Sequence, residues 1–535
     1  MADGCGRWRL LRSKEAITVI VWYAVISLWL QGEGFAPAYM FNRSSAGQWT
    51  YAVCIALSYP IIGLMADMWI GRYKIITFSL WLKWATVVVV TLISSLVVIY
   101  QQTLMAGTVS DVLVIILTIV EQVGFSTFQV TAIQFGTDQL QDAPRDQLSS
   151  FIFWYICVEQ VATPIVEWVN FSLYLPKTIT ELLWALTGWC MIVASLLTLV
   201  LVVKNCFMTR WFVREPGTPN PYRLVYHVVK FAWKHKHPVQ RSALSDQEEK
   251  PSRLDYGKCK YGGPFLNEEV EIVKILFRLS AVLFSLLGIF ILIFSLQDNW
   301  QTLVLNHIGG RTSHNSLPFL LEAASDTVVL GLLIPLHELV IYPLFQKYIP
   351  SMVKRILIGA ALYLCCALSI FLLDLVGHVK NRRLDCFYFF PLELSDSTET
   401  LDLSSYYVLI PNILYGVATI IFHVSLIEFI VLHSPHSMKG MLLGTYYTVR
   451  YGVTEAFPLS LQYAFAYHDS NHPLSCASSY YFMLLIIGLI SLILFILVSY
   501  KLRNWKRSEE IDIHSFIEDG IDQTGCNKYE TNVLQ

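Results

Sequence analysis

Ionisable residues lie inside long apolar segments of this 535-residue chain. Glu159, His423, Glu428, Arg450 and Glu455 are all placed in stretches dominated by Leu, Ile, Val, Phe and Tyr. A charged side chain at the centre of a bilayer costs about 2.5–3.5 kcal/mol, so such residues usually face the interior of a helix bundle or a wet cavity. These five residues are therefore candidates for a path that carries a solute or a proton.

Arg450 is the costliest of them to bury because a guanidinium does not lose its proton in a protein. It should therefore have a carboxylate partner, for which Glu159, Glu428 and Glu455 are the candidates. Glu455 is the poorest placed, since a spacing of five residues lies off the i,i+4 ridge of a helix. A static interhelical ion pair and a transport role both account for such a pair. His423 is a proton-responsive group or a hydrogen-bonded helix contact.

The elements that position these residues are predicted to be transmembrane helices. The chain is 55% hydrophobic and only 15% charged, whereas soluble domains carry about 25% charged residues. Its apolar runs are long enough to cross a hydrocarbon core about 30 Å thick. We predict an all-α membrane protein with twelve spans, at 15–34, 48–66, 75–99, 111–135, 149–171, 181–203, 271–296, 317–345, 353–376, 405–432, 440–466 and 479–502.

A polar, basic segment at 204–270 divides these spans into two groups of six. The predicted domains are an N-terminal six-helix bundle at 1–203, a linker at 204–270, a C-terminal six-helix bundle at 271–502 and an acidic tail at 503–535. Lys and Arg also gather at the N-terminus, at 346–355 and just after 502. The positive-inside rule places all of these segments, and both termini, in the cytoplasm.

Two further features agree with this orientation. The N-glycosylation sequons at Asn42 and Asn170 fall in segments predicted to lie outside. Cys386 and Cys476 also fall outside, where an oxidising compartment would allow a disulfide between them. The alternative is two unpaired thiols.

Several classes of function find no support in the sequence. There is no CxxC pair, HExxH, GxSxG or Walker-type loop, so we expect neither an enzyme nor a bound metal or cofactor. The basic residues follow the membrane topology, so nucleic-acid binding is not indicated. The expected partners are a small-molecule solute and membrane lipid.

Three stretches resemble one known family. The sequence GLMADMWIGRYK at 63–74 resembles the loop motif of the major facilitator superfamily in its proton-dependent oligopeptide transporter version; its motif positions are Gly63, Asp67, Gly71, Arg72 and Lys74. FGTDQL at 135–140, with Asp138 and Gln139, is followed by FIFWY at 151–155 and resembles a second element of that family. IEF at 427–429 with SPHSMK at 434–439 is similar to a third, and Tyr59-Pro60 also matches.

The resemblance implies two pseudo-symmetric bundles, alternating access around a central site, and proton-coupled uptake of di- and tripeptides. Several residues that this activity would require differ here. The family pattern ExxERFxYYG aligns with 15–24 and keeps Glu15 and Tyr23, but its second Glu and its Arg become Thr18 and Val19. By the same alignment the family's buried Lys, Glu and Asn become Gln129, Thr419 and Glu159.

We therefore expect the family fold with an altered substrate or altered coupling. The leading hypothesis is a secondary active transporter of a small, oligopeptide-like organic solute. Proton coupling would run through Glu159 or Glu428, and Arg450 would act as a counter-charge or bind a carboxylate. The predicted path consists of Glu15, Tyr23, Tyr59, Gln129, Glu159, Thr419, His423, Glu428, Arg450 and Glu455.

The alternative hypothesis is a transporter-shaped receptor or scaffold that binds a ligand without turnover. The 204–270 linker and the acidic tail would then offer surfaces for partners. Plasma membrane and endolysosomal membrane are both compatible with the sequence.

Overall fold

The structure is a computed structural model, and it describes a defined part of the chain. The described residues are 13–32, 45–99, 108–140, 143, 146–158, 196, 199–200, 203–204, 212, 221–235, 252–296, 332–345, 348–380, 407, 409–453 and 477–518. Nearly all of them are helical. One isolated bridge joins Lys258 to Phe265.

The N-terminal half contributes long helices built from uninterrupted apolar sequence. They are α1 (Lys14–Gly32), α3 (Ser45–Met68), α4 (Arg72–Ile99) and α5 (Thr108–Asp138), followed by a helix that begins at 146 and is described to 158. At a rise of 1.5 Å per residue, the 24, 28 and 31 residues of α3, α4 and α5 are long enough to cross a bilayer. Gly71 provides the sharp turn between α3 and α4, because its φ of 84° is one that only glycine adopts readily.

The linker and the C-terminal half follow in chain order. The described linker elements are the amphipathic helix α8 (Pro221–Lys234) and the short helices η4 (Arg253–Gly257) and η5 (Cys259–Tyr261). The later helices are α9 (Asn267–Ser285) with its continuation Leu287–Leu296, α12 (Tyr342–Phe345), α13 (Met352–Lys380), α14 (Leu409–Thr419), α15 (Ser425–His433), η11 (His436–Met438), α16 (Lys439–Tyr447) and α18 (Ala477–Glu518).

Three π-helical segments interrupt the C-terminal helices. They are η6 (His337–Ile341), η10 (Ile420–Val424) and η12 (Thr448–Val453). π-Bulges inside α-helices occur frequently at functional sites. Here they carry ionisable residues that lie within predicted spans, namely His337 and Glu338, His423, and Arg450.

The described helices agree with the predicted positions of the spans. By length and composition, Met352–Leu373, Leu409–His433 and Tyr480–Lys501 can each cross a membrane. α9 and its continuation, bent by 42°, pass the same test together and fit the predicted span 271–296. The count of twelve stays a prediction, because parts of several spans lie outside the described residues. One boundary differs: α18 continues to Glu518, beyond the predicted end at 502. The sequence after 502 contains no Gly or Pro before Gly520, so nothing there breaks the helix.

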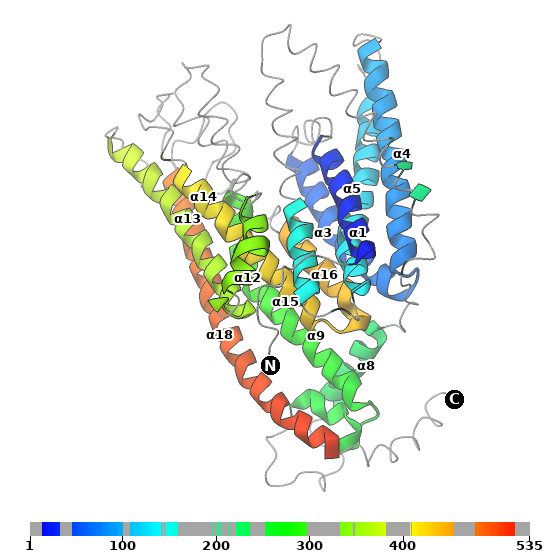
Figure 1. The fold of residues 1–535 in the computed structure, drawn as a ribbon, viewed down its shortest axis with the longest axis vertical. Coiled ribbons are helices and arrows are strands. Elements are labelled where there is room, and N and C mark those ends of the chain that lie inside the picture. The colour runs from blue at the N-terminus through cyan, green and yellow to red at the C-terminus, as the bar shows by residue number, and fades with distance from the viewer. Residues whose placement is uncertain are drawn as a thin grey trace.

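The two halves approach each other at one end of the molecule. In Figure 1, the blue and cyan helices α1, α3, α4 and α5 lie on one side and α13, α14 and α18 on the other, with α15 and α16 between them toward the lower end. α8 and the start of α9 lie below. By the predicted topology, this lower end is the cytoplasmic one.

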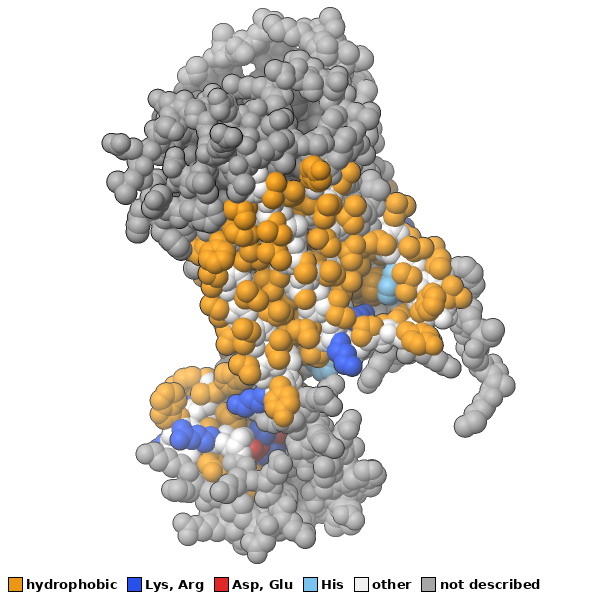
Figure 2. Space-filling model, turned by 90° about the vertical axis from the view of Figure 1, so that its left-hand side faces the viewer, with side chains coloured by type: hydrophobic (Ala, Val, Ile, Leu, Met, Phe, Trp, Pro, Cys, Tyr) orange, Lys and Arg blue, Asp and Glu red, His pale blue; other side chains and the backbone are white. Residues whose placement is uncertain are grey.

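The outer surface of the C-terminal half is apolar where the predicted spans cross the membrane. Figure 2 shows a continuous hydrophobic face with Lys and Arg at its lower margin. On α18, exposed side chains recur at Ile486, Leu489, Ile490, Ile493 and Leu497. Such a face suits lipid, and the cations below it follow the positive-inside rule.

Candidate functional site

A buried polar cluster links the two halves of the chain. Tyr59 of α3 donates a hydrogen bond from its hydroxyl to Oε1 of Gln129 on α5, at 3.1 Å. Nε2 of Gln129 in turn donates to the hydroxyl of Tyr451 in η12, at 3.3 Å. Tyr59 and Gln129 are both almost fully buried. Two predicted path residues from different helices therefore meet each other and a residue of the second half.

Arg450 adjoins this cluster on the C-terminal side. Its guanidinium carbon lies 4.9 Å from the centre of the Tyr451 ring, a cation–π arrangement. Nη1 of Arg450 donates to the hydroxyl of Tyr446 at 3.4 Å. The same hydroxyl lies 3.1 Å from Nδ1 of His423 in η10, and it can donate to this nitrogen while it accepts from Arg450. The predicted residues His423 and Arg450 are thus joined through a tyrosine.

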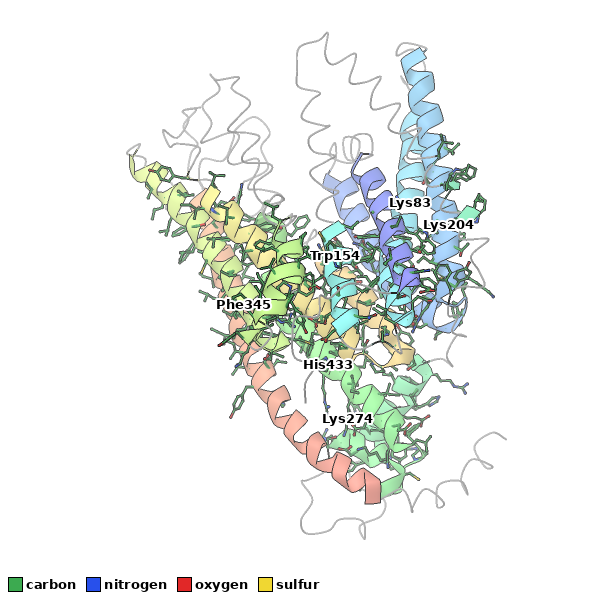
Figure 3. All side chains as sticks on the ribbon, in the orientation of Figure 1. Lys83, Trp154, Lys204, Lys274, Phe345 and His433 are labelled. Atoms are coloured by element: carbon green, nitrogen blue, oxygen red, sulfur yellow. The ribbon has the colours of Figure 1, made fainter. Side chains whose placement is uncertain are left out.

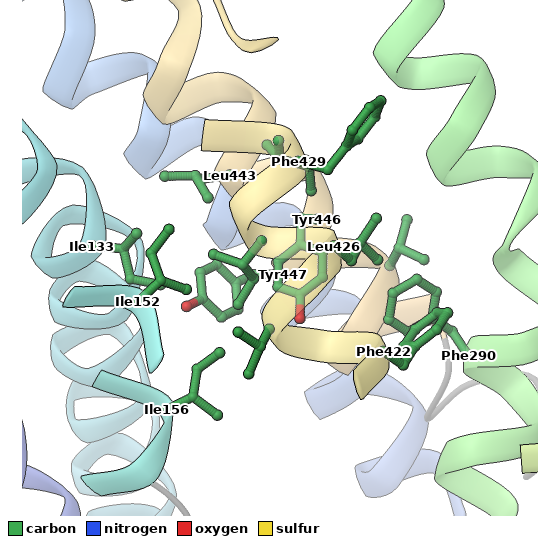
Figure 4. Packing of buried hydrophobic residues seen from close by; sticks show 14 of the residues in the cluster. Ile133, Ile152, Ile156, Phe290, Phe422, Leu426, Phe429, Leu443, Tyr446 and Tyr447 are labelled. Carbon is green, nitrogen blue, oxygen red and sulfur yellow. The ribbon is translucent and has the colours of Figure 1, made fainter. Parts of the chain in front are cut away.

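Aromatic and aliphatic side chains from both halves enclose these tyrosines. Figure 4 shows Tyr447 directed toward Ile133 and Ile152, and Tyr446 on the side of Leu426 and Phe422. Tyr447 also stacks on Tyr59, with ring centroids 5.6 Å apart. Tyr446 and Tyr447 are therefore buried, whereas Arg450 and Tyr451 are partly exposed.

Thr419 and Gln129 occupy the positions at which the family resemblance places a buried Glu and a buried Lys, respectively. The two residues have different hydrogen-bond partners. The hydroxyl of Tyr363 on α13 donates to Thr419 Oγ1 at 2.8 Å, and Thr419 itself donates to the carbonyl of Tyr415. Gln129 bonds to Tyr59 and Tyr451 instead. The two neutral residues are each satisfied locally, so no uncompensated charge is left by the loss of a charged pair.

The two predicted path residues on α1, Tyr23 and Glu15, differ in their burial and in their contacts. Tyr23 is buried, and its ring stacks on Tyr155 at a centroid distance of 3.9 Å. Glu15 is at the start of α1, where it accepts a hydrogen bond from Ser13 at 2.9 Å. Tyr23 belongs to the packed interior, whereas Glu15 lies in the first turn of its helix.

The predicted loop motif forms a buried ionic network at the end of the molecule that the predicted topology places in the cytoplasm. Arg72 binds Asp138 at 2.6 Å and Asp67 at 3.1 Å. Gln134 donates a further hydrogen bond to Asp67. The C-terminal half completes the network, because the backbone amide of Met441 donates to Asp67 at 3.1 Å and the Lys439 ammonium lies 3.6 Å from Asp138.

Gly63 of this motif lies where the backbones of α3 and α16 cross at close range. A Cβ atom placed on Gly63 would lie 2.2 Å from the carbonyl oxygen of Gly440, and one on Gly440 would lie 2.8 Å from that of Gly63. One on Gly444 would lie 2.6 Å from the carbonyl oxygen of Tyr59. Gly440 and Gly444 form a GxxxG spacing, which lets helix backbones approach closely in membranes. The halves touch here backbone to backbone.

Glu428 takes part in a second link between the halves. Its carboxylate accepts hydrogen bonds from Ser149, in the helix that begins at 146, and from Arg355 at the start of α13, the latter at 2.9 Å. Arg355 is therefore the ion-pair partner of Glu428, and Arg450 is not. Nearby, the ring of Phe153 stacks on His337 at 4.4 Å.

The sequence-predicted site residues thus fall into two described groups. Tyr59, Gln129, His423 and Arg450 gather in the central cluster, whereas Gly63, Asp67, Arg72, Asp138 and Glu428 lie at the cytoplasmic contact between the halves. Lys74 is exposed and Gln139 is partly exposed. The following predicted residues lie outside the described part of the chain: Asn42, Glu159, Asn170, Cys386, Glu455 and Cys476.

Several residues of these groups were not singled out from the sequence. Arg355 was taken only as a basic residue of the 346–355 loop, and Lys439 only as the end of the motif at 434–439. The tyrosines Tyr446, Tyr447 and Tyr451 were not considered. Lys83 was also not singled out, and it is only 1% exposed. Its position within the predicted span 75–99 could have marked it as a buried polar residue, because a lysine that cannot reach water needs polar partners inside the helix bundle.

The linker is tied to the first turns of α9 by a compact charge network, in which Asp255 lies before the predicted span 271–296. Asp255 of η4 accepts hydrogen bonds from Ser252 and Lys274 and lies 2.9 Å from Lys258. Glu271 pairs with both lysines, at 2.6 and 2.9 Å. Figure 3 places Lys274 toward the lower end of the molecule. Burial alone would raise the pKa of Asp255, but Lys274, Ser252 and Lys258 outweigh it and hold the pKa at about 2.

This pKa predicts how the linker responds to acid. Because the pKa of Asp255 is depressed in the folded state, its stabilising contribution is complete above its unfolded value near 4 and is lost as pH falls toward 2. The contribution is on the order of 2 kcal/mol. Asp255→Asn should therefore lower the protection factors of the amides at 252–258 at neutral pH, while the wild-type protection factors should be alike at pH 7 and pH 5. The exposed Glu268→Gln is the control; equal exchange in the two variants would contradict the prediction.

These features define a helical membrane protein whose two halves meet through a polar interior and through the close contact of α3 with α16. The sequence profile of the POT family matches residues 89–472, and the chain belongs to that family. Solute carrier family 15 member 3 of Mus musculus is 23% identical over 341 residues, an alignment that covers 60% of this chain and 56% of that protein. The predicted family and fold class are thereby confirmed.

Two solved structures share the fold. The POT family transporter PepTSo aligns with a TM-score of 0.60 at 13% identity, over 91% of this chain and 98% of its own. An auto-inhibited POT family peptide transporter aligns with a TM-score of 0.58 at 15% identity, over 91% and 97%. Members of this family are multi-pass membrane transporters.

Proposed function

We propose that this protein moves a small, oligopeptide-like organic solute across a membrane by alternating access. The observation that carries the proposal is the central polar cluster, which draws Tyr59 and Gln129 from one half and Arg450 and His423 from the other. A site shared by both halves changes shape when the halves move, which is what alternating access requires. The closed contact at Gly63 and Gly440 serves as the cytoplasmic gate.

The cluster favours a solute with a carboxylate and without a required amino group. Arg450 is a permanent cation with five N–H donors in a planar fork, which matches a carboxylate. The positions that the family resemblance assigns to a charged Lys and a charged Glu are the neutral Gln129 and Thr419. An acylated amino acid or a modified short peptide fits this charge pattern better than a free dipeptide.

Proton coupling is assigned to Glu428. Its carboxylate holds Arg355 and Ser149 together across the cytoplasmic contact. Arg355 and Glu428 belong to the same half, whereas Ser149 belongs to the other. Protonation would remove the negative charge that strengthens the hydrogen bond from Ser149, so proton uptake would favour separation of the halves at this end. Glu159 is a second candidate for the same role.

Substitution of Arg450 tests the substrate site. In proteoliposomes with an imposed pH gradient and a panel of peptides, acylated amino acids and organic acids, Arg450→Ala should lower uptake of the transported acid about tenfold or more, equivalent to at least ~1.4 kcal/mol of lost binding. Arg450→Lys keeps the positive charge but lacks the planar guanidinium, so its uptake should lie between those of wild type and Arg450→Ala. Equal uptake by all three proteins would contradict the assignment, and saturable binding without accumulation in wild type would favour the receptor hypothesis.

Glu428→Gln separates coupling from translocation in the same assay. Because glutamine cannot take up a proton, accumulation driven by the pH gradient should disappear. Exchange of labelled for unlabelled solute across the membrane should persist, since it needs no net proton movement. Retained gradient-driven accumulation would overturn the role given to Glu428.

A further inference from the structure

The linker helix α8 has two faces with different surroundings. Its inner face is apolar: Val228 and Ala232 are buried, and Val228 packs with Val270 and Val273 of α9. Its outer face carries large aromatic side chains in the open, with Tyr226 60% and Trp233 84% exposed. A solvent-facing tryptophan on a short helix that already buries its other face is not explained by folding.

Basic residues surround these aromatic residues. Arg223, His227, Lys230 and Lys234 are all exposed on α8, and no acidic residue occurs between 221 and 235. The ammonium group of Lys230 lies 5.3 Å from the centre of the Tyr226 ring. The outer face of α8, defined by these six residues, therefore combines positive charge with aromatic rings along one side of one helix.

The position of α8 brings this face near the level of the predicted cytoplasmic membrane surface. In Figure 1, α8 lies just below α16 and the lower end of α4. Its second residue, Tyr222, has a pKa raised to about 12, first by burial and then by the negative charge of Asp67 at the cytoplasmic end of α3. The helix thus begins beside the end of a membrane span.

We propose that the outer face of α8 binds the anionic headgroups of cytoplasmic-leaflet lipids. Trp and Tyr favour the membrane interface because one part of each ring system is apolar and another part is polar. Clustered Lys and Arg at this level are attracted by the negative surface potential of a membrane that contains acidic lipids. Charge complementarity and membrane proximity together favour lipid over a soluble acidic partner. The proposal is independent of which solute the protein carries.

The test compares lipid compositions around the full-length protein. Hydrogen exchange of residues 221–234 is measured in nanodiscs of phosphatidylcholine alone and with about 30 mol% phosphatidylserine, which supplies a negative surface potential. Exchange should be severalfold slower with phosphatidylserine. The double substitution Lys230→Glu with Lys234→Glu should remove this difference, and Trp233→Ala should reduce it.

Two controls keep the result interpretable. Lys354→Glu reverses an exposed charge elsewhere on the predicted cytoplasmic side and should leave the phosphatidylserine effect intact. Exchange across 267–285 reports whether each variant keeps α9 folded. Equal exchange of α8 in both lipid mixtures overturns the proposal, as does a phosphatidylserine effect that survives the double reversal. Protection that appears only when soluble polyglutamate is added would assign the face to an acidic protein instead.

Discussion

Gly63→Ala is expected to abolish transport while leaving the protein folded. The added methyl group would lie 2.2 Å from the carbonyl oxygen of Gly440, and this neighbour is backbone, which cannot rotate away. α3 and α16 would have to separate, so the closed cytoplasmic contact would be lost. Overpacking typically costs about 1–3 kcal/mol, and each ~1.4 kcal/mol shifts a conformational equilibrium tenfold.

The measurement pairs uptake with a report on conformation. Uptake should fall to background, and hydrogen exchange should rise at the start of α16, where Met441 donates to Asp67. Gly124→Ala is the matched control, because the atoms nearest to its methyl group would belong to side chains and not to the backbone: Leu82 at 3.4 Å and Lys83 at 3.6 Å. Wild-type uptake by Gly63→Ala, or an equal loss in Gly124→Ala, would show that the close crossing does not act as a gate.

Arg72→Ala should cause the largest loss of stability. Arg72 is the shared cation of two buried carboxylates, those of Asp67 and Asp138. Removing one partner of a buried ion pair costs about 3–5 kcal/mol, because the remaining charge is left uncompensated. The lower end of that range is expected, since Gln134 and the amide of Met441 still bond to Asp67. The thermal midpoint and the denaturant midpoint of the purified protein should both fall.

Additional variants distinguish a charge effect from lost packing. Lys74→Ala removes an exposed cation two residues away in the same turn and should change the midpoints little. Combining Arg72→Leu with Asp67→Asn leaves the Lys439–Asp138 pair balanced and should recover most of the lost stability. If this double variant is as unstable as Arg72→Ala, the network contributes through shape and not through charge.

Both predictions concern one contact, at which elements far apart in sequence meet. Asp67 and Gly63 belong to the start of the chain, and Gly440 and Met441 to its last third. Opening this contact must break the Lys439–Asp138 and Met441–Asp67 interactions together. Because these interactions must break together, the contact opens cooperatively, as expected for a transition between two conformational states.

The sequence by itself determined the membrane class, the helical spans, the family and the residues of the loop motif. Each of these depends on local pattern: runs of apolar residues, the distribution of Lys and Arg, and fixed spacings such as 63–74. Buried charge within a span was also visible, and it correctly marked His423, Glu428 and Arg450 as residues with polar partners.

Only the tertiary structure decided which residues are partners. Arg450 was expected to need a carboxylate and Glu428 was one candidate, yet Glu428 pairs with Arg355, 73 residues earlier in the chain. Likewise, Lys439 reaches Asp138 and Tyr446 joins His423 to Arg450. Helix periodicity states which face a residue occupies but not which helix lies opposite. That choice depends on how the two halves pack, and no local pattern records it.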